Sequence, residues 1–343
     1  MSDVKLDLKF GRSHLLRQVG RQSIWGRRGL LKANALWLPL SVFLLTDSGR
    51  HDPRSPLLLI PIFLCVMSWI LVSILTNDLS DSRIDRASGK ERWISSIPRA
   101  GAVGIIIILL LGGLGLLLAF RSPEGAVWSY AAAILLGLSY SLRPFHFKGH
   151  GILGVFVYSL SCALAYALMP GAWLKAGWMA LSLAGTVVFL DKWVNLLFHQ
   201  IIDHEADSKG KIRTYAVRAG LDSARRILCG MEGLASLGML AVLAYIAVHS
   251  GDWRVVILSV VGVSFAAAAA FAGLASKRSK MRTALVSELS WVYLGLTFAV
   301  FRVLPLVLLW TLALESKALW WALGAALVML AAESWQSLRY RYG

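Results

Sequence analysis

Charged residues are scarce in this chain, and their scarcity excludes a large group of proteins. Asp, Glu, Lys and Arg make up 16% of its 343 residues, whereas hydrophobic residues make up 57%. Soluble domains are about one-quarter charged, and the mean hydropathy of this chain is +0.65. The composition therefore argues against an ordinary soluble protein and indicates a polytopic membrane protein.

Cysteine is almost absent. Cys65, Cys162 and Cys229 all fall within apolar segments, at no spacing typical of a metal site. We expect them to be small buried hydrophobic residues. The polar leader lacks the apolar stretch of a cleavable signal peptide, so we expect the first membrane segment to target the chain.

Acidic residues are fewer than basic ones, 19 against 35, which gives a formal net charge of +16. The basic residues lie mostly in short loops between apolar runs and form no continuous surface, so we expect no nucleic-acid partner. They concentrate in the N-terminal tail and in every second loop, the distribution that the positive-inside rule describes. We therefore place these loops, and both acidic motifs described below, on the cytoplasmic face of a prokaryotic plasma membrane.

Long apolar segments recur along the chain. They span residues 33–46, 56–76, 100–120, 126–142, 151–170, 176–198, 226–249, 253–275, 288–313 and 317–334. The first and the last are short, so the sequence predicts an all-α, polytopic membrane barrel of nine to ten transmembrane helices. We divide the chain into a basic cytoplasmic tail (1–32), a single transmembrane domain (33–334) and a cytoplasmic C-terminal tail (335–343).

The first acidic motif follows the second apolar segment. Asp78, Asp81 and Asp85 are spaced i, i+3, i+7, which places them on one helical face with Asn77 at its edge. Three adjacent carboxylates repel one another, so metal ions or basic groups must balance their charge. Oxygen ligands with room for water and phosphate suit Mg²⁺, and we predict that all four residues are metal ligands.

The second acidic motif, Asp203 and Asp207, follows the sixth apolar segment. The two motifs lie four helices apart, which suggests two pseudo-repeated halves, approximately 33–150 and 151–275, that each contribute one metal site. We predict that Asp203 and Asp207 are also metal ligands. Together the two sites would form a metal–diphosphate clamp at the mouth of the barrel.

A polar stripe leads into the second motif. Five residues recur every four positions: Asp191, Asn195, His199, Asp203 and Asp207. The spacing predicts that a single helix carries all five. Asp191 and Lys192 lie inside an apolar span, where ionisable groups usually face a bundle interior or an aqueous cavity. Asp191, Lys192, Asn195 and His199 are therefore pocket candidates, although Asp191 and Lys192 could instead pair with each other at a helix contact.

These motifs resemble those of the UbiA superfamily of intramembrane prenyltransferases, over roughly residues 33–313. The family's NDxxDxxxD motif is matched by Asn77, Asp78, Asp81 and Asp85, and its DxxxD motif by Asp203 and Asp207. Its K-x-R-x-I element resembles Lys90, Arg92 and Ile94, with Trp93 where a proline is usual. Its YS-x-x-P…K element resembles Tyr140, Ser141, Pro144 and Lys148, and its trailing G…T resembles Gly210 and Thr214.

The resemblance implies a helical barrel, open to lipid, that binds an isoprenyl diphosphate through two Mg²⁺ ions. It would transfer the prenyl group to a lipophilic or aromatic acceptor. The implied catalytic residues are Asp78, Asp81, Asp203, Lys148 and Tyr140. The candidates for diphosphate binding are Asn77, Arg83, Lys90, Arg92, Lys148 and Lys209; of these, Arg83 and Lys209 are chosen only for their proximity in sequence. We expect the prenyl tail to enter an apolar lumen directly from the bilayer.

Two other functions remain open. A membrane terpene cyclase of the same fold would ionise the same diphosphate and quench the cation within its own chain, without an acceptor. A transporter is suggested by Asp191, Lys192 and Arg302 within spans. The clustering of aspartates at helix ends, rather than at mid-membrane helix breaks, argues against transport. The sequence selects neither an acceptor nor an oligomeric state.

Overall fold

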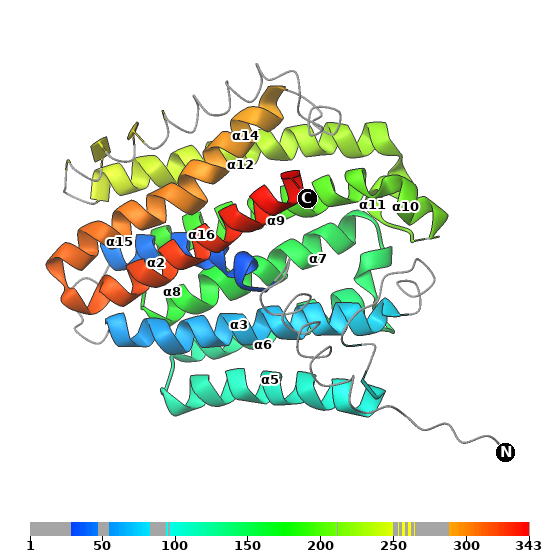
Figure 1. Ribbon diagram of the computed structural model, residues 1–343, viewed down its shortest axis with the longest axis horizontal. Helices are drawn as coiled ribbons and strands as arrows, with labels where there is room; N and C mark the ends of the chain where they lie inside the picture. Colours follow the sequence, from blue (N-terminus) through cyan, green and yellow to red (C-terminus); the bar gives the residue numbers. More distant parts are fainter. Residues whose placement is uncertain are drawn as a thin grey trace.

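The computed structural model describes residues 29–46, 55–82, 94, 97–210, 212–249 and 288–342, and also positions 253, 256, 257, 260, 261 and 264. Helices are the regular elements throughout these ranges (Figure 1). The first half holds α2 (Gly29–Thr46), α3 (Ser55–Ser80), α5 (Arg99–Ala119), α6 (Glu124–Ser141), η4 (Phe147–Gly149), α7 (Ile152–Ala163), η5 (Leu164–Leu168) and α8 (Met169–Trp173). The second half holds α9 (Trp178–Ile202), α10 (His204–Lys209), α11 (Tyr215–Ala219), α12 (Leu221–His249), α14 (Glu288–Phe298), η7 (Ala299–Val303), α15 (Leu304–Glu315), η8 (Lys317–Leu319) and α16 (Trp320–Tyr342).

Six helical stretches in the described part are long and apolar enough to cross a membrane. They are Pro56–Ser80, Arg99–Ala119, Ile152–Trp173, Trp178–Ile202, Leu221–His249 and Val292–Glu315. Two shorter apolar helices, Ala35–Leu45 and Lys317–Ala331, flank them in sequence. The prediction of an all-helical, polytopic membrane fold is confirmed. The count of nine to ten spans stays a prediction, because most of segment 253–275 lies outside the described residues.

The bundle is built around α2. Every residue from Ala35 to Leu45 is buried, and α2 contacts α3, α9, α15 and α16. A helix that is apolar on all sides is typical of such a buried position. Around it α3 packs on α6, α6 on α7, α7 on α9, α9 on α12, and α12 on α14 (Figure 1). The helices α3, α6, α7 and α9, together with α2 and η7, surround the cavity described below.

Helix α5 covers the outer face of α3 (Figure 1). It begins directly after Pro98, which suits a helix start because proline has no N–H to donate. Large apolar side chains on its outer side are exposed, Ile108 by 70% and Leu118 by 63%. In a chain of this hydropathy these side chains face lipid rather than water.

Gly113 allows α5 to approach its neighbours closely. A Cβ atom at this position would lie 1.9 Å from Tyr130 Oη on α6 and 3.0 Å from Ser68 Oγ on α3. Those two hydroxyls are hydrogen-bonded to each other at 3.1 Å. The glycine therefore leaves room for a polar contact that joins α3 to α6, and Ser68 Oγ also donates to Leu109 O on α5.

Gly113→Ala is expected to lower the melting temperature of the purified protein, because overpacking a tight contact costs about 1–3 kcal/mol. Gly112→Ala is the matched control, since a Cβ atom there meets nothing within 4 Å. Alanine also favours a helix over glycine by about 1 kcal/mol, so the control should not lose stability. Thermal unfolding in detergent measures both variants. Equal melting temperatures for the two would contradict this account of the packing.

Candidate functional site

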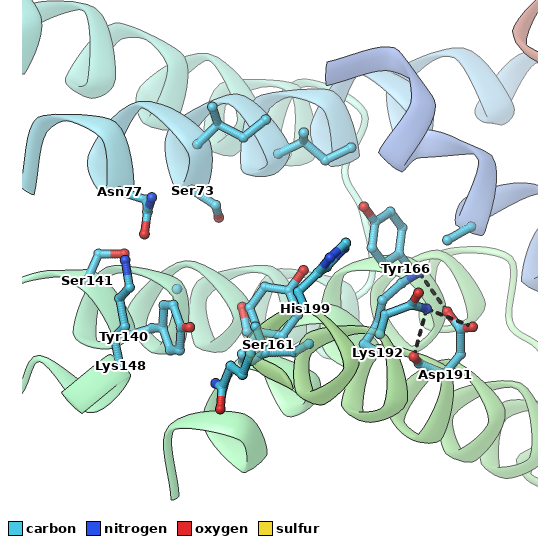
Figure 2. A pocket seen from close by; sticks show the side chains of 18 of the residues that line it. Ser73, Asn77, Tyr140, Ser141, Lys148, Ser161, Tyr166, Asp191, Lys192 and His199 are labelled. Atoms are coloured by element: carbon cyan, nitrogen blue, oxygen red, sulfur yellow. Dashed lines mark hydrogen bonds and ion pairs between the residues drawn. The ribbon is translucent and has the colours of Figure 1, made fainter. Parts of the chain in front are cut away.

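A cavity of 630 Å³ lies inside the ring of helices. Figure 2 shows its two ends. Asn77, Ser141 and Lys148 lie at one end, Tyr166, Asp191 and Lys192 at the other, and Ser161 and His199 between them. The first end is called the aspartate end below, and the second the inner end.

Two helices terminate at the aspartate end. Asn77 and Asp78 lie in the last turn of α3, and Asp203 directly follows the last residue of α9. Asp207, on α10, lines the same cavity. The fold thus brings the two sequence motifs together at one cavity.

One helix prediction is wrong at this end. The four-residue spacing predicted that a single helix carries Asp191 through Asp207, but α9 ends at Ile202 and α10 begins at His204. The segment 203–211 is polar apart from Ala206 and contains Gly210, so no apolar face holds it against the bundle as a continuation of α9. All five residues of the stripe still line the cavity.

The position of these carboxylates at helix C-termini has an electrostatic consequence. The unpaired carbonyls of a C-terminus carry partial negative charge, which destabilises a nearby carboxylate. Asp78 and Asp203 both lie at such ends. Of the described side chains that line the cavity, Lys148 is the basic one at this end. The excess of negative charge favours a bound cation.

Lys148 forms an ion pair with Asp81, the residue directly after α3. The Asp81 N–H donates to Asn77 O at 2.9 Å, and Ser80 Oγ donates to Ser141 O at 2.8 Å. These contacts fix the end of α3 against the end of α6. The predicted residue Tyr140 is buried beside them, with its ring 5.6 Å from that of Tyr158.

The segment that carries Lys148 depends on a glycine in α7. A Cβ atom on Gly154 would lie 2.3 Å from Phe147 O and 3.4 Å from Lys148 Cα. The adjoining His146 lies outside the cavity lining, and burial first and Lys148 second lower the pKa of its imidazole. A neutral imidazole adds no further positive charge next to Lys148.

Gly154→Ala is expected to displace η4 and, with it, Lys148. We expect kcat for the reaction proposed below to fall about tenfold or more, because a displacement near 1 Å of a catalytic group costs up to about 10²-fold. Steady-state kinetics and a melting curve on the same preparation measure the effect. Gly125→Ala is the control, because its Cβ would make only an ordinary 3.5 Å contact. Wild-type kcat in Gly154→Ala would show that the glycine does not position Lys148.

The donor set at the aspartate end fits a hard divalent cation. It consists of carboxylate oxygens from Asp78, Asp203 and Asp207 and the amide oxygen of Asn77, and such oxygens suit Mg²⁺. Within the described ranges, no three His, Cys, Asp or Glu side chains converge tightly enough to hold a metal ion alone. Mg²⁺ commonly takes one or two carboxylates plus phosphate oxygens, so an open set of this kind fits a metal–diphosphate pair.

Two predicted site residues in the described part of the chain, Asp81 and Lys209, do not line the cavity. Lys209 pairs with Glu205 at 2.8 Å on the exposed surface, where the pair raises the pKa of the lysine and lowers that of the glutamate. Exposed pairs of this kind contribute little to stability. The other members of the predicted set lie outside the described residues: Arg83, Asp85, Lys90 and Arg92.

The lining of the cavity is more polar than the sequence predicted, since an apolar lumen was expected. Polar side chains from four helices line it: Ser73, Ser141, Tyr158, Ser161, Asn195 and His199. Trp69 Nε1 donates to Ala133 O and Ser161 Oγ, both at 3.3 Å. Single polar residues barely change the hydropathy of a span, but helix packing collects them on the inner faces.

Sequence reasoning missed residues that the fold gathers around the lumen. Ser73 precedes Asn77 by four residues, so helical spacing from the first motif could have identified it. Gln200, which the sequence analysis did not single out, accepts the Tyr215 N–H at 3.0 Å through its Oε1. The neighbouring Thr214, already named by the resemblance, is buried, and its hydroxyl has no hydrogen-bond partner among the described residues. No local pattern marks these contacts, because they join α9 to the segment that follows it.

Comparison with known proteins agrees with this architecture. The model of the UbiA prenyltransferase family matches residues 35–289, and no curated protein matches the chain. A UbiA homologue from Archaeoglobus fulgidus bound to GPP and Mg²⁺ is 14% identical, with a TM-score of 0.52 over 88% of this chain and 96% of that one. Its structure with DMAPP and Mg²⁺ gives 18% identity and a TM-score of 0.52 over 63% and 75%. A structure described for digeranylgeranylglyceryl phosphate synthase gives 19% and 0.55 over 84% and 99%.

At sequence identities this low, similarity to solved structures shows only that the fold is shared. Membership of the family is shown instead by the match to the family model. The match covers most of the chain, including both aspartate motifs and the helices α3, α6, α7 and α9 that surround most of the cavity. The six apolar helical stretches and the family match identify the chain as an integral membrane protein. The chain belongs to the UbiA prenyltransferase family.

Proposed function

We propose that the protein transfers a prenyl group from an isoprenyl diphosphate to a lipophilic or aromatic acceptor within the membrane. One observation carries the proposal: Asp78 from the first motif and Asp203 and Asp207 from the second line a single cavity together with Lys148. Structures of a related protein bound to DMAPP or GPP with Mg²⁺ support this choice of donor. The distribution of basic loops supports a cytoplasmic position for the aspartate end.

The chain's own groups account for ionisation of the donor. We assign Asn77, Asp78, Asp81, Asp203 and Asp207, with Asp85, to hold the divalent cations of a metal–diphosphate complex. Mg²⁺, when bound, stabilises the negative charge of the departing diphosphate. Lys148, held by Asp81, directs a fixed positive charge toward the same leaving group. The rings of Tyr140 and Tyr158 line the cavity beside it, and their π faces stabilise an allylic cation.

The polarity of the lumen favours transfer over cyclisation. A cyclase needs an inert wall around its cation, whereas this lumen presents hydroxyl, amide and imidazole groups from Ser161, Asn195 and His199. Such groups would quench an allylic cation before it could cyclise. They can, however, orient a polar acceptor beside the prenyl carbon that reacts. Purified protein given geranylgeranyl diphosphate alone should therefore return the substrate. A cyclic hydrocarbon or alcohol in the mass spectrum would instead show a cyclase.

Chelation tests the metal assignment. EDTA should reduce prenyl transfer to background, and excess Mg²⁺ should restore it, because most of the leaving-group stabilisation is lost without the cation. The measurement is product formation, by mass spectrometry, from several prenyl diphosphates crossed with a panel of acceptors. Full turnover in EDTA would contradict a metal-dependent donor site.

A further inference from the structure

Two buried carboxylates of the bundle already have polar partners. Asp191 accepts hydrogen bonds from the Lys192 ammonium at 2.7 Å and from Tyr293 Oη at 2.8 Å. Glu232, buried on α12, accepts the Ser290 hydroxyl at 2.9 Å. Contacts within the bundle therefore account for both groups. Within the described ranges, positive charge without an acidic partner lies instead on the surface, around the segment that joins α6 to α7.

This segment, residues 142–151, has an exposed arginine near each end. Arg143 lies one residue beyond the C-cap of α6. Arg218, on α11, donates from Nη1 to Gly149 O at 3.4 Å. A Cβ atom on Gly151, directly before α7, would lie 3.8 Å from the Cδ and Nη1 atoms of Arg218. Arg218 therefore packs against the start of α7.

The pKa of His146 shows that further basic groups lie close together here. Burial and then Lys148 lower this pKa most, Asp81 raises it, and Arg143 and His150 lower it further. The Nδ1 atom of His150 also lies 3.1 Å from the backbone oxygen of His146. The fixed cations around η4 are thus the lysine and the two arginines.

Acidic groups in the described part of the chain do not neutralise the two arginines. Asp81 is paired with Lys148, while Asp203 and Asp207 line the cavity. Asp222 is exposed in the first turn of α12 and forms no ion pair with a described residue. Neither arginine has an acidic partner among the described residues, so their charge is available to an anion.

Exposed apolar side chains border the same arginines. Phe145 is 58% exposed and stacks on Phe147, with the ring centroids 5.8 Å apart. Ile152, Leu153 and Phe156 are exposed on the first turns of α7, directly after the glycine that the α11 arginine contacts. In a membrane protein, aromatic and basic side chains gather at the level where hydrocarbon meets lipid headgroups. The surface thus has an apolar part for acyl chains and a basic part for a headgroup.

We propose that this surface binds an anionic phospholipid, with Arg218 and Arg143 at its headgroup and the exposed face of α7 against its acyl chains. The guanidinium fork matches the geometry of phosphate oxygens. Each arginine near the membrane surface also favours lipids of net negative charge over zwitterionic ones. Inorganic phosphate offers the same oxygens but has no apolar part to cover α7. The proposal uses the membrane location of the chain and does not depend on prenyl transfer.

Native mass spectrometry of the purified full chain in detergent tests the site. The probes are phosphatidylglycerol and phosphatidylcholine with identical acyl chains, supplied in equal amounts with EDTA present. The measurement is the ratio of the two lipids in the species that retains one lipid. Arg143→Gln/Arg218→Gln should lower this ratio about fivefold or more relative to wild type, the effect of one arginine near a charged lipid surface. Arg143→Lys/Arg218→Lys should keep most of the preference, because it keeps the charge.

Arg225→Gln/Arg226→Gln is the matched control, since it removes the same charge from exposed positions on α12. Its lipid ratio should stay close to wild type, and melting curves should show that both glutamine pairs fold. Inorganic phosphate, added at constant ionic strength, should leave the wild-type ratio unchanged. An unchanged ratio in Arg143→Gln/Arg218→Gln, or an equal loss in the control, overturns the proposal. Loss of the preference on addition of phosphate would show a site for soluble phosphate and would also overturn it.

Discussion

Asp203→Ala is expected to lower kcat/KM for prenyl transfer by about 10²–10³-fold. The substitution removes a ligand oxygen from an open donor set, in which few other groups can replace it. Stabilisation of a departing oxyanion is commonly the largest single contribution to catalysis, and loss of one contributor costs about 10²–10³-fold. The measurement is product formation at saturating Mg²⁺, together with equilibrium binding of geranyl diphosphate.

Asp222→Ala supplies the matched control, because Asp222 is exposed in the first turn of α12 and does not line the cavity. Its activity and melting temperature should stay close to wild type. Asp78→Ala is expected to reproduce the loss seen in Asp203→Ala. The double variant should be little worse than either single one, because residues that act on one bound ligand are strongly non-additive. Independent, additive losses would mean that the motifs serve different ligands, and full activity of Asp203→Ala would remove the second motif from the site.

The sequence predicted the aspartate end because the information there is local. Asn77 and Asp78 follow an apolar run of membrane length, and Asp203 follows another, so both helix ends could be located from hydropathy. The break after Ile202 was missed because a four-residue polar spacing looks the same whether the helix continues or ends. Only the loss of an apolar face, and not the spacing, marks the end of α9.

The inner end could be predicted only in part. Asp191 and Lys192 stand out as charges in an apolar run, but their partner Tyr293 lies 102 residues further along the chain. The turns η5 and η7 each insert one extra residue into a helix without changing its hydropathy, so no periodicity reveals them. Tertiary packing brings the ring centroids of Tyr166 and Phe301 to 5.7 and 5.9 Å from Lys192 Nζ, and this had to be seen in three dimensions.

Lys148→Met is expected to lower kcat by about 10²-fold while the protein still folds. Methionine keeps the length and most of the apolar contact of lysine but cannot stabilise the charge that develops on the departing diphosphate. Loss of the lysine ammonium also breaks the ion pair that Lys148 forms with the Asp81 carboxylate. A carboxylate without its ammonium is a better metal ligand, so half-maximal Mg²⁺ should fall even as kcat falls.

The Mg²⁺ titration separates two roles for this lysine. If Lys148 acts on the leaving group, kcat of the Lys148→Met enzyme stays low at saturating Mg²⁺, and Lys148→Arg recovers part of it by restoring a cation of different shape. If Lys148 only neutralises the charge of the Asp81 carboxylate, saturating Mg²⁺ neutralises that charge instead, and kcat of the variant returns to the wild-type value. Lys317→Met, which alters a lysine outside the cavity, should leave both kcat and the Mg²⁺ midpoint unchanged. A fully restored kcat would therefore assign leaving-group stabilisation to the metal site alone and reduce Lys148 to a structural partner of Asp81.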